Sequence, residues 1–124
     1  LVIPLRRTVE IFALRQYFHE INSKDIRSWE NCLKKMKSAC LENTYNKIIE
    51  CDIEFHRLIV ERSNIVDINT IWNLLISRVQ GHFMRNYHKY GDPMEIYYEH
   101  EAILSMFKTG KLDAAIQILE SNIE

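Results

Sequence analysis

Apolar residues recur along most of the chain at the three- and four-residue spacing of amphipathic helices. This period predicts six helices, each with an apolar face turned toward a shared core. The third segment is apolar over much of its circumference, which indicates a central helix. The predicted helices cover about residues 8–21, 24–40, 43–61, 65–87, 93–108 and 112–123.

Residues that start or stop helices separate these segments. Asn22 or Ser23 can cap the second helix, and the run 92–95 (Asp-Pro-Met-Glu) is a typical helix start. The Thr-Gly-Lys turn around Gly110 separates the last two helices. Because connections this short make neighbouring helices antiparallel, the predicted fold class is all-α, an antiparallel bundle of about six helices.

Composition narrows the class of protein further. The 124 residues are 47% hydrophobic and 27% charged, which is typical of one folded domain. Only three glycines and two prolines are present, too few for a turn-rich β-protein. The formal net charge of −1 leaves no basic excess for binding a phosphate backbone. Three cysteines without a C-x-x-C spacing argue against a disulfide framework, and together these features favour a cytoplasmic protein without a membrane anchor.

The first residues, Leu-Val-Ile-Pro-Leu-Arg-Arg, lack the long apolar stretch and cleavage site of a secretory signal. We interpret residues 1–7 as the end of a linker and residues 8–124 as the helical domain.

Four polar residues interrupt the apolar stripes: Asp52, His56, His100 and Asn122. Asp52 and His56 are four positions apart and therefore share one side of a helix. His100 precedes Gly110 by ten residues and Asn122 follows it by twelve, so the axial mismatch across an antiparallel turn is only about 3 Å. The spacing thus predicts that the side chains face a common point.

An unpaired polar group buried at that point costs about 1–3 kcal/mol, so the four residues need a common partner. A divalent cation such as Zn²⁺, Ni²⁺ or Mn²⁺ suits imidazole and carboxylate donors. The alternative is structural: an ion pair between Asp52 and His56 on a helix surface, with His100 hydrogen-bonded inside the core.

Enzyme signatures are missing from the sequence. It contains no Glu-x-x-His pair, no His-Glu-x-x-His, no glycine-rich phosphate loop and no Gly-x-Ser-x-Gly elbow. A small metal hydrolase would need a general base, for which Glu54 and Glu99 are only nominal candidates. We therefore expect a protein that is not an enzyme.

Four motifs in order resemble one known family. They are Asp-Ile-Glu-Phe-His at 52–56, Asn64, Glu-His-Glu-Ala-Ile at 99–103 and Gly-Lys-Leu-Asp-Ala-Ala at 110–115. From about Val9 to its end, the chain resembles the effector-binding C-terminal (FCD) domain of FadR-type GntR transcription regulators. The resemblance implies an all-α domain that binds a small organic acid, often through a metal held by one Asp and three His. It also implies homodimers and a DNA-binding winged helix-turn-helix, which lies N-terminal in the family and is not part of these residues.

The resemblance assigns roles to individual residues. Asp52, His56 and His100 match three metal ligands, and Asn122 stands where the family usually has a histidine. Arg15 matches the arginine of the family's R-x-x-L-E pattern, with His19 in place of the Glu, and is expected to pair with the effector carboxylate. From the sequence itself, we expect further effector contacts on the fourth helix at Arg78, His82 and Asn86. The alternatives are that Arg15 and Arg78 are solvent-exposed charges and that His82 only fills the core.

We therefore expect a ligand-sensing, dimerising domain of a bacterial transcription regulator. The alternative is a helical protein-interaction module without a small-molecule site, in which the four polar residues are exposed or paired locally.

Overall fold

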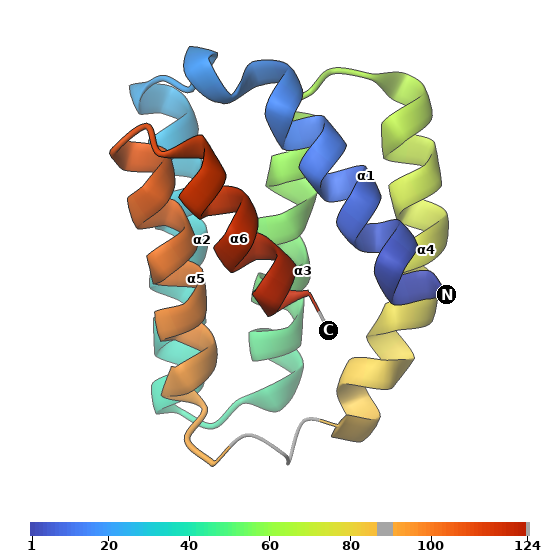
Figure 1. Cartoon of the computed structure of the whole chain (residues 1–124). Coiled ribbons are helices and arrows are strands. Elements are labelled where there is room, and N and C mark those ends of the chain that lie inside the picture. The colour runs from blue at the N-terminus through green and yellow to red at the C-terminus, as the bar shows by residue number, and fades with distance from the viewer. Residues whose placement is uncertain (87–90, 124) are drawn as a thin grey trace.

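The computed structural model describes residues 1–86 and 91–123, without the side chains of residues 80 and 82–86 in the fourth helix. Six α-helices and one short 3-10 helix make up most of this part of the chain, and no strand occurs in it (Figure 1). The all-α prediction is confirmed. The elements are α1 Val2–Tyr17, η1 Phe18–Glu20, α2 Ser23–Leu41, α3 Tyr45–Glu61, α4 Val66–Asn86, α5 Met94–Lys108 and α6 Leu112–Asn122.

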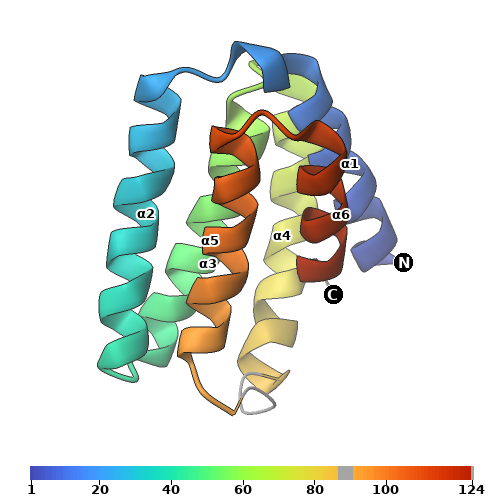
Figure 2. The same ribbon diagram turned by 60° about the vertical axis from the view of Figure 1, so that its left-hand side comes forward.

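The helix α3 is central, as its wide apolar face predicted. It packs against α1, α2 and α4, while α5 packs against α2 and α6, and α6 reaches α1 (Figure 1). Helix α2 packs against both α3 and α5, and Figure 2 shows the short turn that joins α2 to α3. The first helix therefore lies against the middle helix α3, and the last helix lies against α1 and α5.

Local signals in the sequence set the helix ends. Asn22 caps α2 through a reciprocal capping box, in which its side chain accepts from the Asp25 N–H at 2.9 Å. Gly110 has a φ of 68°, a left-handed conformation that costs a glycine little. The Lys111 N–H then donates to the Met106 carbonyl at 3.0 Å and closes the α5 end. This turn makes α6 fold back antiparallel along α5.

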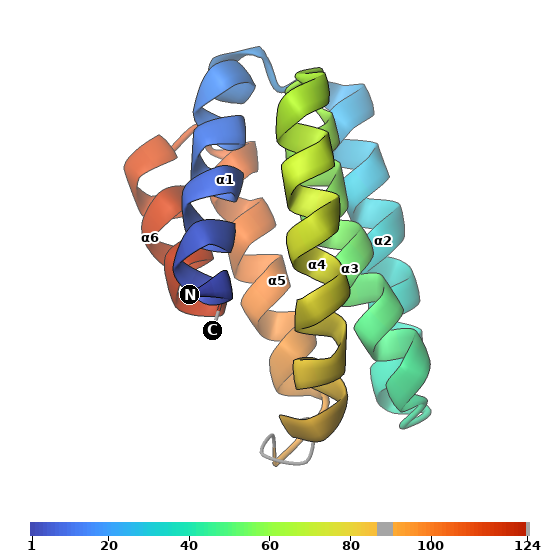
Figure 3. The same cartoon turned by 90° about the vertical axis from the view of Figure 1, so that its right-hand side faces the viewer.

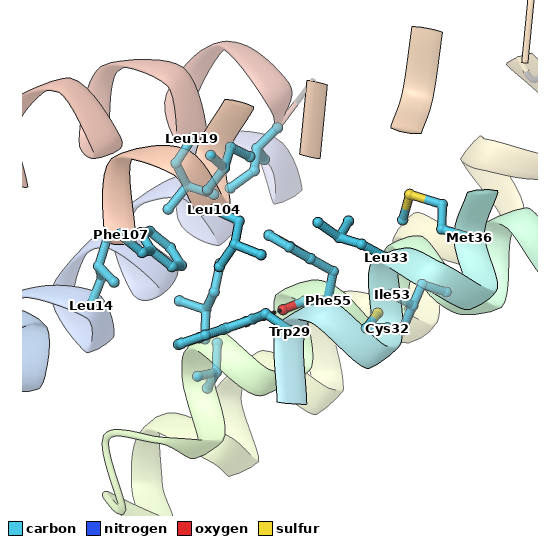
Figure 4. Packing of buried hydrophobic residues seen from close by; sticks show 14 of the residues in the cluster. Leu14, Trp29, Cys32, Leu33, Met36, Ile53, Phe55, Leu104, Phe107 and Leu119 are labelled. Atoms are coloured by element: carbon cyan, nitrogen blue, oxygen red, sulfur yellow. Dashed lines mark hydrogen bonds between the residues drawn. The ribbon is translucent and has the colours of Figure 1, made fainter. Parts of the chain in front are cut away.

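The core between α2, α3, α5 and α6 is aromatic and aliphatic (Figure 4). Trp29 stacks edge-on against Phe107 with ring centroids 4.9 Å apart, and its Nε1–H donates to the Phe55 carbonyl at 3.3 Å. Leu119 of α6 is fully buried in the same core. Dense packing of this kind fixes the rotation of α3 and α5 about their axes, and therefore fixes where their polar side chains point.

The first helix begins at Val2 rather than near Thr8, so residues 2–7, expected to be a linker, form its first turns. Arg6 is buried in these turns, and Pro4 is tolerated because first-turn N–H groups have no intrahelical acceptor. The α-helix then ends at Tyr17, and residues 18–20 form the 3-10 turn. None of the described helices is long and apolar enough to span a membrane.

Candidate metal centre

Three helices bring four polar side chains together inside the bundle. The helix α3 supplies Asp52 and His56, α5 supplies His100 and α6 supplies Asn122. The His100 Nε2 lies 2.7 Å from Asp52 Oδ1, and His56 Nε2 lies 3.4 Å from the same oxygen. The Asn122 Oδ1 lies 2.8 Å from His56 Nε2. We call Asp52, His56, His100 and Asn122 the ligand cluster.

Burial distinguishes this cluster from a surface ion pair. Asp52 is 5% exposed, His56 0% and His100 1%, and their ligand atoms all lie within 4.8 Å of one another. A helix-surface pair between Asp52 and His56 is therefore excluded. If the chain were a protein-interaction module, these side chains could be exposed, but Asp52, His56 and His100 are not.

Each histidine is oriented by a hydrogen bond on its other ring nitrogen. The His56 Nδ1–H donates to Glu10 Oε1 at 2.5 Å, and the His100 Nδ1–H donates to the Ile96 carbonyl at 2.7 Å. Both Nε2 atoms therefore face the ligand cluster. Metal-binding histidines in proteins are commonly held in this way by a carboxylate or a backbone carbonyl.

A second layer of buried groups surrounds Glu10 on α1. Its Oε2 accepts from Arg6 Nε at 2.7 Å and from Trp72 Nε1 at 3.0 Å. Arg6, Glu10 and Trp72 are each at most 1% exposed. We call these three residues the support layer, because their contacts hold the carboxylate that orients His56.

Coupled charges in these two layers shift their pKa values in opposite directions. Burial lowers the pKa of His56, but the carboxylates of Glu10 and Asp52 outweigh burial and raise it to about 9. Burial raises the pKa of Glu10, yet the charges of His56 and Arg6 hold it below its ordinary value. Burial likewise opposes the ionised form of Asp52, and contacts with His100 and His56 keep the pKa of Asp52 far below its ordinary value.

The donor set fits a divalent cation. Bonds of about 2.1 Å place neighbouring ligand atoms roughly 3.0–3.4 Å apart, close to the 2.7 Å and 3.4 Å separations around Asp52 Oδ1. Two imidazole nitrogens, a carboxylate oxygen and an amide oxygen suit Zn²⁺, Ni²⁺ or Mn²⁺. Both Nε2 atoms lie within hydrogen-bond distance of ligand-cluster oxygens, at the place that a cation would take.

Two residues predicted to contact the effector lie elsewhere. Arg15 is exposed and lies about 140° around α1 from Glu10, since successive residues turn by about 100°. Arg78 is exposed on α4. The structure brings neither residue into the ligand cluster. The side chains of His82 and Asn86 lie outside the part of α4 whose side chains are described. Glu54, the nominal general base, is half-exposed and pairs with Arg57 on the surface.

Arg6 and Glu10 are the residues that the sequence interpretation missed. Together with Ala13 and Tyr17 they form one stripe with spacings of four, three and four, and all four are buried. Arg6, Val9 and Glu10 also fit the R-x-x-L-E pattern that the resemblance matches to Arg15, with Val9 for the leucine. Both signals were available in the sequence, but interpreting residues 1–7 as a linker hid them.

Comparisons with known proteins agree with this architecture. The family model of the FCD domain matches residues 2–124. The structure is similar to that of E. coli McbR/YncC, with a TM-score of 0.84 and 18% sequence identity. That similarity covers 98% of this chain and 58% of the other, so this chain spans little more than half of that protein. No curated protein sequence matches the chain.

Proposed function

This chain belongs to the FCD domain family, as its motifs predicted, and on that premise we propose that it is the ligand-sensing domain of a bacterial GntR/FadR-type transcription regulator. In this proposal it binds a small organic acid through a divalent metal. Binding modulates the operator affinity of an N-terminal winged helix-turn-helix domain, and the regulator acts as a homodimer. The observation that carries the proposal is the convergence of buried Asp52, His56 and His100 with partly buried Asn122 on one point.

The charge of the buried groups supports an anionic effector. Arg6 contributes one positive charge, and Glu10 and Asp52 contribute two negative charges. A divalent cation in the ligand cluster adds two positive charges. The result is one net positive charge inside the bundle. Since uncompensated buried charge is costly, one carboxylate from an effector is a favourable partner.

The metal would supply a Lewis-acid binding point for that carboxylate. Asp52 and the two Nε2 atoms would hold it, and the Asn122 oxygen would complete the set from α6. Glu10 would keep His56 correctly oriented. Sensing is favoured over hydrolysis because Glu54, one of the two nominal bases, faces the surface, where it pairs with Arg57.

The support layer offers a route from the site to the start of the chain. The contact between Glu10 and His56 joins α1 to α3, and Trp72 joins α4 to the same carboxylate. In the family arrangement that the resemblance implies, α1 follows the DNA-binding domain. An effector that binds one arrangement of these helices more tightly shifts the population toward it, and α1 carries that shift to the DNA-binding domain.

The test combines metal analysis with a ligand screen. Protein purified without chelator is dialysed, its metal content is measured by mass spectrometry, and thermal shifts are recorded with mono-, di- and tricarboxylic acids. Bound ligand raises the Tm by mass action, so we expect one class of acid to stabilise the metal-loaded protein. His100→Ala should abolish both metal retention and this stabilisation.

The matched control is His19→Ala, which removes an exposed histidine and should change neither result. A protein that retains no metal and responds to no acid would contradict the proposal. So would a thermal shift that survives in His100→Ala.

A further inference from the structure

One member of the ligand cluster lies at the very end of a short helix. Asn122 is the last residue of α6, which has 11 residues and is the shortest α-helix in the described part of the chain. The last carbonyls of a helix have no intrahelical partner, and a terminal turn opens more readily than the middle of a helix. The Asn122 oxygen nevertheless lies 2.8 Å from His56 Nε2 inside the bundle. A ligand at this position therefore needs contacts that hold the helix end in place.

The next residue makes two such contacts. Ile123 leaves the helix with an extended backbone, at φ −83° and ψ 101°, and its side chain is completely buried. Its carbonyl accepts from Arg7 Nε at 2.7 Å, across 116 positions of sequence. Helices α1 and α6 pack against each other, and Figure 3 shows the start of α1 passing close to the end of α6. The first helix thus fixes the residue that directly follows Asn122.

The charge of Arg7 suits this place. The last turn of α6 contains no basic residue. Because the C-terminal end of a helix carries a partial negative charge, a cation beside it is favourable. Arg7 supplies that cation from another helix, and so stabilises the end of α6 in the position that the contact sets.

Two consecutive arginines connect α1 to the ligand cluster by different routes. Successive residues are about 100° apart around a helix, so Arg6 and Arg7 point in different directions. Arg6 pairs with Glu10, which orients His56, whereas Arg7 contacts the end of α6 next to Asn122. The second turn of α1 therefore supports two members of the cluster, one on α3 and one on α6.

We propose that Arg7 is a positioning residue of the candidate metal centre. It holds the last turn of α6 against α1 and thereby keeps the Asn122 oxygen within reach of the metal. This inference rests on the proposed function and deepens it by adding a connection between α6 and α1. Since coupling between two sites is reciprocal, a shift of α1 that breaks the contact weakens metal binding, and metal binding strengthens the contact to the same degree.

A double-mutant cycle of Zn²⁺ affinity tests the inference. Arg7→Met removes the donor and its charge, and should lower Zn²⁺ affinity about tenfold, as expected for a group that holds a ligand in place. In the Asn122→Ala background the same substitution should lower it less than about twofold, because the positioned donor is already gone. A purely structural role would cause equal losses in both backgrounds. Arg27→Met, at an exposed arginine of α2, is the matched control and should bind as wild type.

Cobalt supplies a spectroscopic signature, because the visible spectrum of Co²⁺ depends on the number and type of its donors. The Co²⁺ spectrum of Arg7→Met should resemble that of Asn122→Ala rather than that of wild type. Arg7→Lys keeps a charged donor on α1, so its Zn²⁺ affinity should lie between those of wild type and Arg7→Met. Circular dichroism establishes that each variant is folded.

Hydrogen exchange measured by mass spectrometry reads the contact without metal. In the metal-free protein, Arg7→Met should exchange at least about tenfold faster over residues 119–123, whereas Arg27→Met should not. Unchanged exchange there, unchanged Zn²⁺ affinity, or equal losses in both backgrounds would each overturn the inference. A wild-type chain that binds no metal contradicts the proposed function and this inference with it. Wild-type binding that Arg7→Met does not alter overturns this inference alone.

Discussion

Glu10 and His56 lie 46 positions apart in the sequence and meet at 2.5 Å between Oε1 and Nδ1. The contact fixes the tautomer and the rotation of the imidazole ring, and leaves its Nε2 directed at Asp52 and Asn122. It also ties the first turns of α1 to the centre of the bundle. The geometry of the candidate metal centre therefore depends on a residue that is not itself a ligand.

Replacing this carboxylate should weaken metal binding without removing a donor. Glu10→Gln keeps the shape but loses the charge that makes the His56 ring more basic, so Zn²⁺ affinity should fall about 10- to 100-fold. Competition with a chromophoric chelator at constant pH measures the change. Glu54→Gln, at a half-exposed carboxylate on the same helix, is the control and should bind as wild type. Equal affinity in Glu10→Gln would show that the contact does not act on the metal.

The amide in the ligand cluster should set the preference among metals. Asn122→His replaces an amide oxygen with an imidazole, a donor that Zn²⁺ and Ni²⁺ prefer, so affinity for these ions should rise about tenfold or more relative to Mn²⁺. Isothermal titration calorimetry with each ion gives the ratio. Asn31→His, which adds a histidine on the exposed surface of α2, should leave it unaltered. A ratio that does not change would place Asn122 outside the coordination sphere.

Metal uptake should release protons. Since the pKa of His56 is raised to about 9, the ring carries a proton on Nε2 near pH 7, and a cation at that point displaces about one proton or more per ion. Calorimetry in buffers of different ionisation enthalpy counts them. Affinity should also rise at least about tenfold per pH unit between pH 6 and 8. Binding without proton release would contradict the described hydrogen-bond pattern.

The metal-free protein should lose stability as the pH rises. The pKa of His56 is raised to about 9, so its contribution is complete well below an unfolded-state value near 6.5 and is lost as the pH rises toward 9. Between pH 6.5 and 8 the loss should be roughly 1–2 kcal/mol in the free energy of unfolding. Burial raises the pKa of Cys32 to about 12, so this thiol adds little below pH 8.

Urea unfolding at several pH values, with a chelator present, measures how the free energy of unfolding changes with pH. The lowered pKa values of Glu10 and Asp52 determine the stability at acidic pH. Their contribution to the free energy of unfolding is present above the ordinary pKa of a carboxyl group and is lost as the pH falls below it. Maximal stability is therefore expected between about pH 5 and 6.5. A stability that is constant from pH 6.5 to 8 would show that His56 is not protonated in the folded protein.

The buried arginine should matter far more than the exposed one on the same helix. Arg6→Met removes one of the two cationic partners of buried Glu10, and breaking a buried pair in this way costs about 3–5 kcal/mol. Arg15→Met should change stability by less than about 0.5 kcal/mol, because Arg15 is exposed. Denaturant unfolding of the two variants compares them directly. Similar losses in both would contradict the assignment of Arg6 to the interior.

Several features of the fold and of the ligand cluster were available from the chain itself. The six helices follow from apolar spacing, and Asn22 and Gly110 mark helix ends through capping and turn chemistry. His100 and Asn122 could be placed at the same height along α5 and α6, because a tight turn joins these helices and the number of residues on each side of Gly110 gives the axial position. Their convergence with Asp52 and His56 is confirmed by the geometry.

The sequence by itself determined which residues form helices and which polar side chains interrupt their apolar stripes, because helical periodicity and turns depend on neighbours within a few positions. Only the tertiary structure decided that Arg6 rather than Arg15 belongs to the interior. The spacing of Arg6 and Glu10 shows that they share a stripe, but whether ionised side chains on that stripe are buried depends on partners from other helices, here His56 and Trp72 on Glu10.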